Sequence, residues 1–160
     1  MAHVIGVSKA ETYTSAQYRL GDVYVETENG IEKEFVFVQL SASAQNAAVA
    51  GTVLYYTTNM NGVVTDDIST TKQNLWAGIA IGAIAKGSYG WIQYDGPMGG
   101  IAISVSSAAI GDAMIGHSTT DGKATNVAAD TAPTNKVIGI FTTAAASAGV
   151  TSASALLGRF

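Results

Sequence analysis

Two stretches of this chain share one pattern of turns, and that internal repeat restricts the possible folds more than any other feature. Residues 51–65 (GTVLYYTTNMNGVVT) and 111–125 (GDAMIGHSTTDGKAT) align so that Asn61-Gly62 falls on Asp121-Gly122. Asn-Gly and Asp-Gly are preferred centres of type I′ hairpin turns, because both central residues need a positive φ angle. Since the turns persist while the side chains differ, the repeat predicts two related β-modules and not a duplicated catalytic centre.

The rest of the chain also has the residue pattern of a β protein. Eighteen glycines separate short alternating runs that are rich in Val, Ile, Thr and Tyr. No stretch places apolar residues at the i, i+3, i+4 and i+7 spacing of an amphipathic helix over three turns. We therefore expect an all-β fold that consists of two related small β-barrel or sandwich modules, the product of an internal duplication, with an extended N-terminal arm.

The expected units divide the chain into three parts. Residues 1–19 form the arm, residues 20–100 the first β-module and residues 101–160 the second. Residues 96–100 (GPMGG) are expected to be a turn or linker, because Gly and Pro together interrupt regular structure. The arm has too few apolar residues for a core of its own. We expect it to be mobile in the free protein and to gain order along the strand edge of a partner.

Strand boundaries follow from the alternation of apolar and polar residues. The first hairpin is expected over residues 21–25 and 34–40, around the turn at Asn29-Gly30. Residues 75–85 and 101–106 are expected to form further strands.

Charge is sparse and is concentrated in one region. Only 12 % of residues are charged, against about a quarter in ordinary soluble domains. No apolar run approaches the roughly 20 residues that span a bilayer, and Lys and Arg occur singly, so neither a membrane nor nucleic acid is an expected partner. The acidic residues gather in 21–34. This pattern predicts a solvated or edge-protecting strand face, with contact to a basic partner surface as the alternative.

The first residues lack the basic and apolar regions of a secretory signal. The absence of cysteine excludes disulfides and fits synthesis in a reducing compartment. We therefore do not expect secretion through a signal peptide.

Residues 77–93 (AGIAIGAIAKGSYGWIQ) carry a block of the form AGxAxGAxxxGxYGWxQ, preceded by GTVLYY and followed by an IGDA module. This block resembles the small head decoration (cement) proteins of tailed bacteriophages, and the resemblance covers roughly residues 20–160. It implies a β-rich fold and assembly into trimers or other small oligomers on the outside of the capsid, where the protein stabilises the expanded shell. No catalytic residue belongs to the pattern.

The side chains that could support catalysis do not form a known motif. His117 lies next to Ser118, but the chain has no G-x-S-x-G nucleophile elbow. Asp66-Asp67 lacks the D-x-[DN]-x-[DN]-G spacing of a calcium loop, so we interpret it as a solvated loop pair. We accordingly expect no enzyme activity, no catalytic or metal-binding residue and no cofactor.

Tyr89 and Trp91 lie two residues apart on an expected strand and therefore share one face. Such a pair could form a carbohydrate-stacking platform, but it is more typical of a protein core or a subunit interface.

These expectations together predict a virion structural protein, a capsid decoration subunit made in the host cytoplasm and bound to the outer surface of the capsid. Its expected partners are the major capsid protein and its own copies in a homotrimer. Residues 77–85 and the terminal Leu156, Leu157 and Phe160 are candidates for the contact between copies. The alternative is a phage surface or fibre-type module that recognises a host glycan through Tyr89 and Trp91, and a hydrolase with an unrecognised site is a third possibility.

Overall fold

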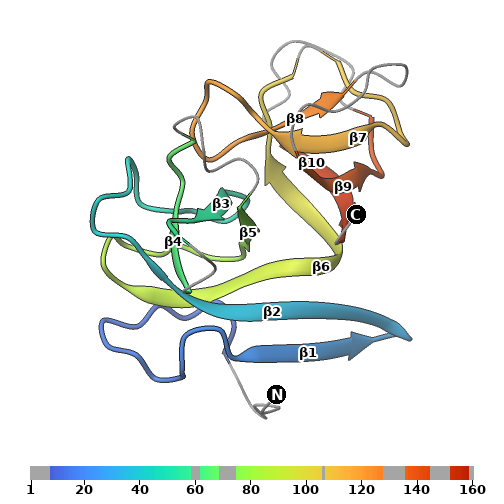
Figure 1. Ribbon diagram of the computed structural model, residues 1–160. Helices are drawn as coiled ribbons and strands as arrows, with labels where there is room; N and C mark the ends of the chain where they lie inside the picture. The colour runs from blue at the N-terminus through green and yellow to red at the C-terminus, as the bar shows by residue number, and fades with distance from the viewer. Residues whose placement is uncertain are drawn as a thin grey trace.

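The computed structural model describes residues 8–58, 62–68, 75–105, 107–127, 136–144 and 152–158, and these residues form strands and no helix (Figure 1). All ten strands belong to one sheet. They are β1 (Val23–Glu28), β2 (Ile31–Leu40), β3 (Val53–Tyr56), β4 (Val63–Thr65), β5 (Trp76–Ala80), β6 (Tyr89–Ala102), β7 (Ala113–Gly116), β8 (Ala124–Val127), β9 (Val137–Phe141) and β10 (Ser152–Leu157). The prediction of an all-β fold is confirmed.

The hairpin of β1 and β2 is determined by local turn chemistry. Asn29 has a φ angle of 53° and Gly30 one of 77°, which are the positive values that a type I′ turn requires. Glu28 pairs with Ile31 directly beside the turn, and the ladder continues to Val23 and Val36. The predicted first hairpin is therefore correct.

Five strands close into a first ring. β2 pairs with β4 in parallel, β3 lies between β4 and β5, and β5 pairs with β6. β6 then returns to pair with β2, so the circle of pairings β2-β4-β3-β5-β6 is closed. Closure leaves these strands without a free edge.

A second ring shares β6 with the first. Its strands β8, β7, β9 and β10 follow one another as β4, β3, β5 and β6 do in the first ring. β6 pairs with β10, and the pairings continue through β9 and β7 to β8. A parallel bridge from Ile103 to Ala124 closes this ring. The first ring has a register shift between Leu54 and Tyr55, where β3 pairs with β5, and the second has one between Met114 and Ile115, where β7 pairs with β9.

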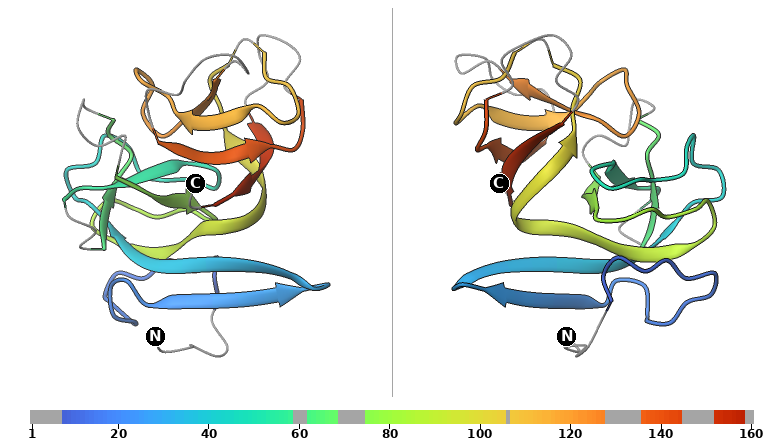
Figure 2. Two further views of the ribbon diagram at one scale, coloured as in Figure 1. Left: turned by 45° about the vertical axis from the view of Figure 1, so that its right-hand side comes forward. Right: turned by 180° about the vertical axis from the view of Figure 1, so that it is seen from behind.

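β6 passes from one ring to the other without interruption (Figure 2). The prediction of a turn or linker at residues 96–100 is wrong, because these residues lie inside β6 and residues 96–98 pair with β10. Gly96 and Gly100 have φ angles of 89° and 72°, which allow the strand to bend. A Cβ atom on Gly96 would also lie only 2.4 Å from the carbonyl oxygen of Glu32. The glycines that suggested a break instead let one strand serve both rings.

The other expected strands are shorter than predicted or continue into neighbouring residues. Of residues 75–85, only Trp76–Ala80 form a strand, and Ile84 makes an isolated bridge to Ala48. Of residues 101–106, the first two belong to β6.

One hydrophobic core extends through both rings. It contains Leu54 and Ile92 of the first ring together with Met114, Phe141 and Leu157 of the second. A smaller aromatic cluster lies outside this core and consists of Phe35, Phe37 and Trp91.

The N-terminal segment covers the aromatic cluster. Tyr13 and Tyr18 pack against it, and Tyr13 exchanges two backbone hydrogen bonds with Tyr89, of 3.0 and 2.8 Å. In Figure 2 the segment runs beside β1 and β2. Residues 8–19 thus pack against their own chain, so the predicted arm that gains order only on a partner is not confirmed, and residues 1–7 lie outside the described residues.

Candidate interaction surface

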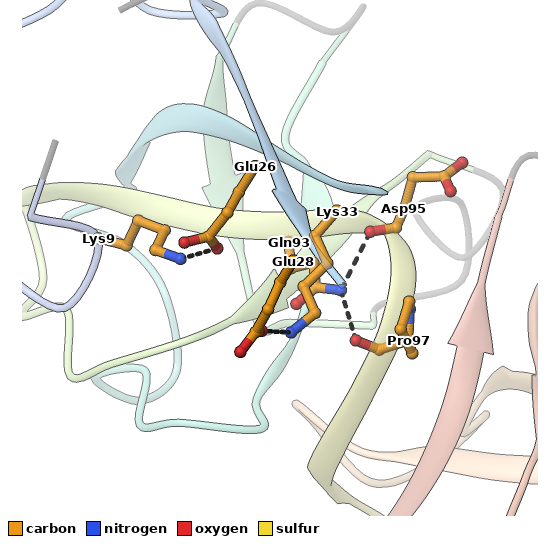
Figure 3. A network of polar contacts seen from close by, with 7 residues as sticks. All are labelled: Lys9, Glu26, Glu28, Lys33, Gln93, Asp95 and Pro97. Carbon is orange, nitrogen blue, oxygen red and sulfur yellow. Dashed lines mark hydrogen bonds and ion pairs between the residues drawn. The ribbon is translucent and has the colours of Figure 1, made fainter. Parts of the chain in front are cut away.

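The acidic hairpin and the N-terminal segment form a polar network on one end of the molecule (Figure 3). The ammonium group of Lys9 pairs with the carboxylate of Glu26. The ammonium group of Lys33 lies 3.3 Å from Glu28 Oε2, and Lys33 stands directly opposite Glu26 in the β1–β2 ladder. The two lysines therefore lie among the glutamates of β1.

Lys9 also fixes the N-terminal segment to the sheet. Its Nζ atom lies 4.7 Å from the centroid of the Phe35 ring, a distance at which a cation is attracted to the face of an aromatic ring. Because Lys9 makes this contact and the ion pair with Glu26 together, residues 8–10 belong to the same surface as the hairpin.

The bend of β6 lies next to this network and is held by hydrogen bonds of its own. Gln93 is only 4 % exposed, and its Nε2 atom donates hydrogen bonds to the carbonyl oxygens of Asp95 and Pro97, both at 3.0 Å. Glu34 stands opposite Asp95 at a register shift and accepts a hydrogen bond from the Tyr94 hydroxyl. The buried amide thereby satisfies two carbonyl oxygens where the strand turns toward the second ring.

The hairpin has an excess of negative charge, which is divided between its two faces. Glu26 and Glu28 lie on the same face as Lys33 and pair with Lys9 and Lys33, whereas the register places Glu32 and Glu34 on the opposite face. β1 is also the terminal strand of the sheet, so the charges protect an edge from unwanted strand pairing. The hairpin can bind a cationic partner through the carboxylates on the face away from the two lysines.

Two cavities lie near this end of the molecule. One of about 380 Å³ is lined by Ser8, Lys9, Glu26 and Phe35, among others. Another, of about 300 Å³, has walls formed by Tyr56, Trp76 and Tyr94, with Lys136 and other residues.

The structure buries Trp91 and leaves Tyr89 partly exposed beside it. Trp91 is 1 % exposed, its ring centroid lies 5.2 Å from those of Phe37 and Tyr18, and Tyr89 is stacked on Phe37. The interpretation of this pair as core is therefore confirmed for Trp91. A sugar cannot stack on a ring that other side chains already cover.

His117 has a structural role in the second repeated turn. Its Nδ1 atom accepts hydrogen bonds from the backbone N–H groups of Thr119 and Thr120, at 3.1 and 3.0 Å. Burial lowers the pKa of His117, and nearby Lys123 lowers it further. The neutral imidazole is thus the form that stabilises the turn.

Asp66 is buried, which the sequence did not indicate. It is 1 % exposed, and its carboxylate accepts hydrogen bonds from the backbone of Gln45 and Asn46 and from the Asn46 side chain, at 2.9 to 3.0 Å. The interpretation of Asp66 as a solvated loop residue is wrong, because these donors replace its water. Its carbonyl oxygen also accepts a hydrogen bond from the Gly122 N–H, which joins the loop after β4 to the second repeated turn.

The residues predicted to join copies of the chain lie in different environments. Leu156 is 44 % exposed, whereas Leu157 is buried in the core. Residues 77–80 are buried as well, and Phe160 lies outside the described residues. Of this set, Leu156 is thus the large apolar side chain that the structure places on the surface.

No family model, curated protein or solved structure matches the chain. Within the described ranges, no group of three or more His, Asp or Glu side chains is placed to hold a metal ion. Those same ranges contain no helix long and apolar enough to cross a membrane.

Proposed function

We propose that this protein is a virion structural protein, a capsid decoration subunit that binds the outer surface of a phage head and stabilises the mature shell. It is made in the host cytoplasm, binds the major capsid protein and acts as a homotrimer. The proposal begins from the glycine and aromatic block of residues 77–93, which resembles such proteins.

The observation that carries the proposal is the uneven distribution of charge over the molecule. The hairpin of β1 and β2 carries Glu26, Glu28, Glu32, Lys33 and Glu34. By contrast, β7, β9 and β10 of the second ring contain no charged residue. Such a difference suits a subunit that binds a shell through a polar surface and its own copies through an apolar one.

The mechanism is a shift of equilibrium by binding. A protein that binds only the expanded shell stabilises that state by mass action, and a lattice repeats the gain at every site. The acidic hairpin would bind a basic surface of the shell, and the attraction would be steered and strengthened by the opposite charges.

We further propose that the two rings arose by internal duplication and that residues 1–19 are an arm added to the first. Equivalent backbone hydrogen bonds support the duplication. Gly51 N–H donates to the Ala80 carbonyl at 2.8 Å and Gly111 N–H to the Phe141 carbonyl at 2.9 Å. The divisions at residues 20 and 101 stay predictions.

Binding to purified undecorated shells tests the function. The full chain is expected to sediment with expanded shells in amounts comparable to the major capsid protein, and absence of binding would contradict the proposal. The Glu28→Gln, Glu32→Gln double variant should bind at least tenfold more weakly at low salt, with a smaller difference at high salt because ions screen the attraction. Lys86→Gln, an exposed charge outside the hairpin, is the matched control and should bind normally.

A further inference from the structure

Four residues of the second ring lie in one row across four neighbouring strands. Leu156 on β10 pairs with Pro97 on β6 and with Ile140 on β9. Ile140 in turn pairs with Ala113 on β7. We call these four residues the apolar row. All four are at least partly exposed, and Leu156 is the most exposed of them.

The row points away from the core. Leu157, Phe141 and Met114, which are the immediate neighbours of row residues along their strands, are buried. Successive side chains of a strand point to opposite faces. The row is therefore on the outer face of the second ring.

The strands that carry the row contain few charges, although Asp112 borders Ala113 and Asp95 lies two residues before Pro97. β7, β9 and β10 lack charged residues, and so does the second half of β6, from Gly96 to Ala102. Solvent-exposed sheet faces usually alternate apolar and polar residues, so an uncharged outer face with apolar side chains on four adjacent strands is typical of a contact surface.

The first ring has an equivalent row that is completely covered. Val53 pairs with Ile79, Ile79 with Gln93, and Gln93 with Phe35, and each is 4 % exposed or less. Parts of the same chain provide the cover. Lys9 lies over Phe35, and Val53 and Ile79 belong to the core cluster that contains residues of both rings.

We propose that the apolar row is the surface through which copies of this chain associate. A second copy would cover the row of the second ring, just as the chain itself covers the equivalent row of the first ring. This inference rests on the proposed function, because it assigns the contact between the copies of the oligomer. An uncharged face packs against another copy without like-charge repulsion, and in a trimer the row of each copy would contact the neighbouring copy around the threefold axis. Two acidic hairpins, in contrast, would repel one another.

Sedimentation equilibrium of the full chain at micromolar concentration tests this surface. The wild type is expected to be oligomeric, and Leu156→Glu should sediment as the 16.4 kDa monomer, with its self-affinity reduced at least a hundredfold. Ile31→Glu is the matched control, because Ile31 is 50 % exposed but lies in the hairpin, and it should leave the oligomer intact. Circular dichroism and melting temperature verify that each variant is folded. Leu156→Met, which keeps an apolar side chain, should associate like the wild type.

Binding to shells, measured separately, distinguishes this inference from the proposed function. A wild type that is monomeric in solution but decorates shells overturns the apolar row as the contact and leaves the decoration function standing. An oligomer that Leu156→Glu disrupts, but that binds no shell, supports the row and contradicts decoration. If Leu156→Glu stays oligomeric and loses only shell binding, the row contacts the shell, and the inference is wrong.

Discussion

Tyr55 and Gly116 meet where the two rings pack together, and the contact leaves no space for another atom. A Cβ on Gly116 would lie 1.9 Å from the Tyr55 hydroxyl oxygen. That hydroxyl is buried and has no hydrogen-bond partner among the described residues. Its burial, with Asp121 nearby, raises the pKa of Tyr55. Tyr55 thus contributes packing and carries the cost of an unsatisfied polar atom.

We expect Gly116→Ala to lower the free energy of unfolding by about 3 kcal/mol, because the core is overpacked. Tyr55→Phe should leave stability unchanged or raise it by about 1 kcal/mol, since the unsatisfied hydroxyl is lost. Urea unfolding of both variants and the double variant measures their coupling. The loss from Gly116→Ala should be clearly smaller in the Tyr55→Phe background, and equal losses in both backgrounds would contradict the proposed contact.

His117 predicts a dependence of stability on pH. Its folded-state pKa lies below the ordinary value of 6.5, so the unfolded chain binds the proton more readily. Stability that is fully present above about pH 6.5 is therefore lost as the pH falls toward the folded-state pKa. Melting temperatures from pH 8 to pH 5 should decline less in His117→Gln than in the wild type. His3→Gln is the control, and an identical pH profile for wild type and His117→Gln would exclude this role.

Among the individual elements, the N-terminal segment stabilises the first ring from outside, because it covers the aromatic cluster. The Tyr18 ring contacts both Phe37 and Trp91, with centroids 5.2 Å away in each case. Tyr18→Ala should lower the free energy of unfolding by about 2 kcal/mol, because it uncovers a half-buried aromatic contact. Chemical denaturation measures the change. Gln17→Ala removes an exposed neighbour and should have no effect, whereas an unchanged Tyr18→Ala variant would mean that the segment does not cover the cluster in solution.

The elements that the sequence predicted correctly are those determined by neighbouring residues. The Asn29-Gly30 turn follows from the φ angles that those two residues accept. The type I′ turn predicted at Asp121-Gly122 is wrong, because only Gly122 has a positive φ angle there, of 69°, and Asn61 of the other predicted turn lies outside the described residues. The bend of β6 could not be predicted, since Gly96 and Pro97 have the composition of a turn. Only their pairing with a strand more than fifty residues later makes them part of a sheet.

The candidate site was predictable in its charge but not in its geometry. The acidic residues of 21–34 were evident from the sequence, whereas the position of Lys9 over Phe35 depends on the fold of the N-terminal segment. The burial of Asp66 was missed for the same reason. Its donors, at Gln45 and Asn46, come from a loop twenty residues earlier.

At the scale of the whole molecule, the shared core predicts that both rings unfold together. Core residues of the two rings form one cluster, and β6 supplies a strand to each ring. We expect one calorimetric transition whose van't Hoff and calorimetric enthalpies agree. Residues 101–160 alone should not fold, because they lack nearly all of β6. Two separate transitions, or a folded 101–160 fragment, would show that the modules are independent.

The division of β6 between two partners also has a mechanical consequence. Its ladder with β2 ends at Asp95 and its ladder with β10 begins at Gly96. One continuous strand is therefore hydrogen-bonded to the first ring along one part and to the second ring along the other. A force that pulls the rings apart along β6 loads both ladders in shear, and many hydrogen bonds must break at once. The same bonds would open one after another if the strand were peeled from its end. We therefore expect the two rings to resist tension along β6 more strongly than peeling of the strand from its end.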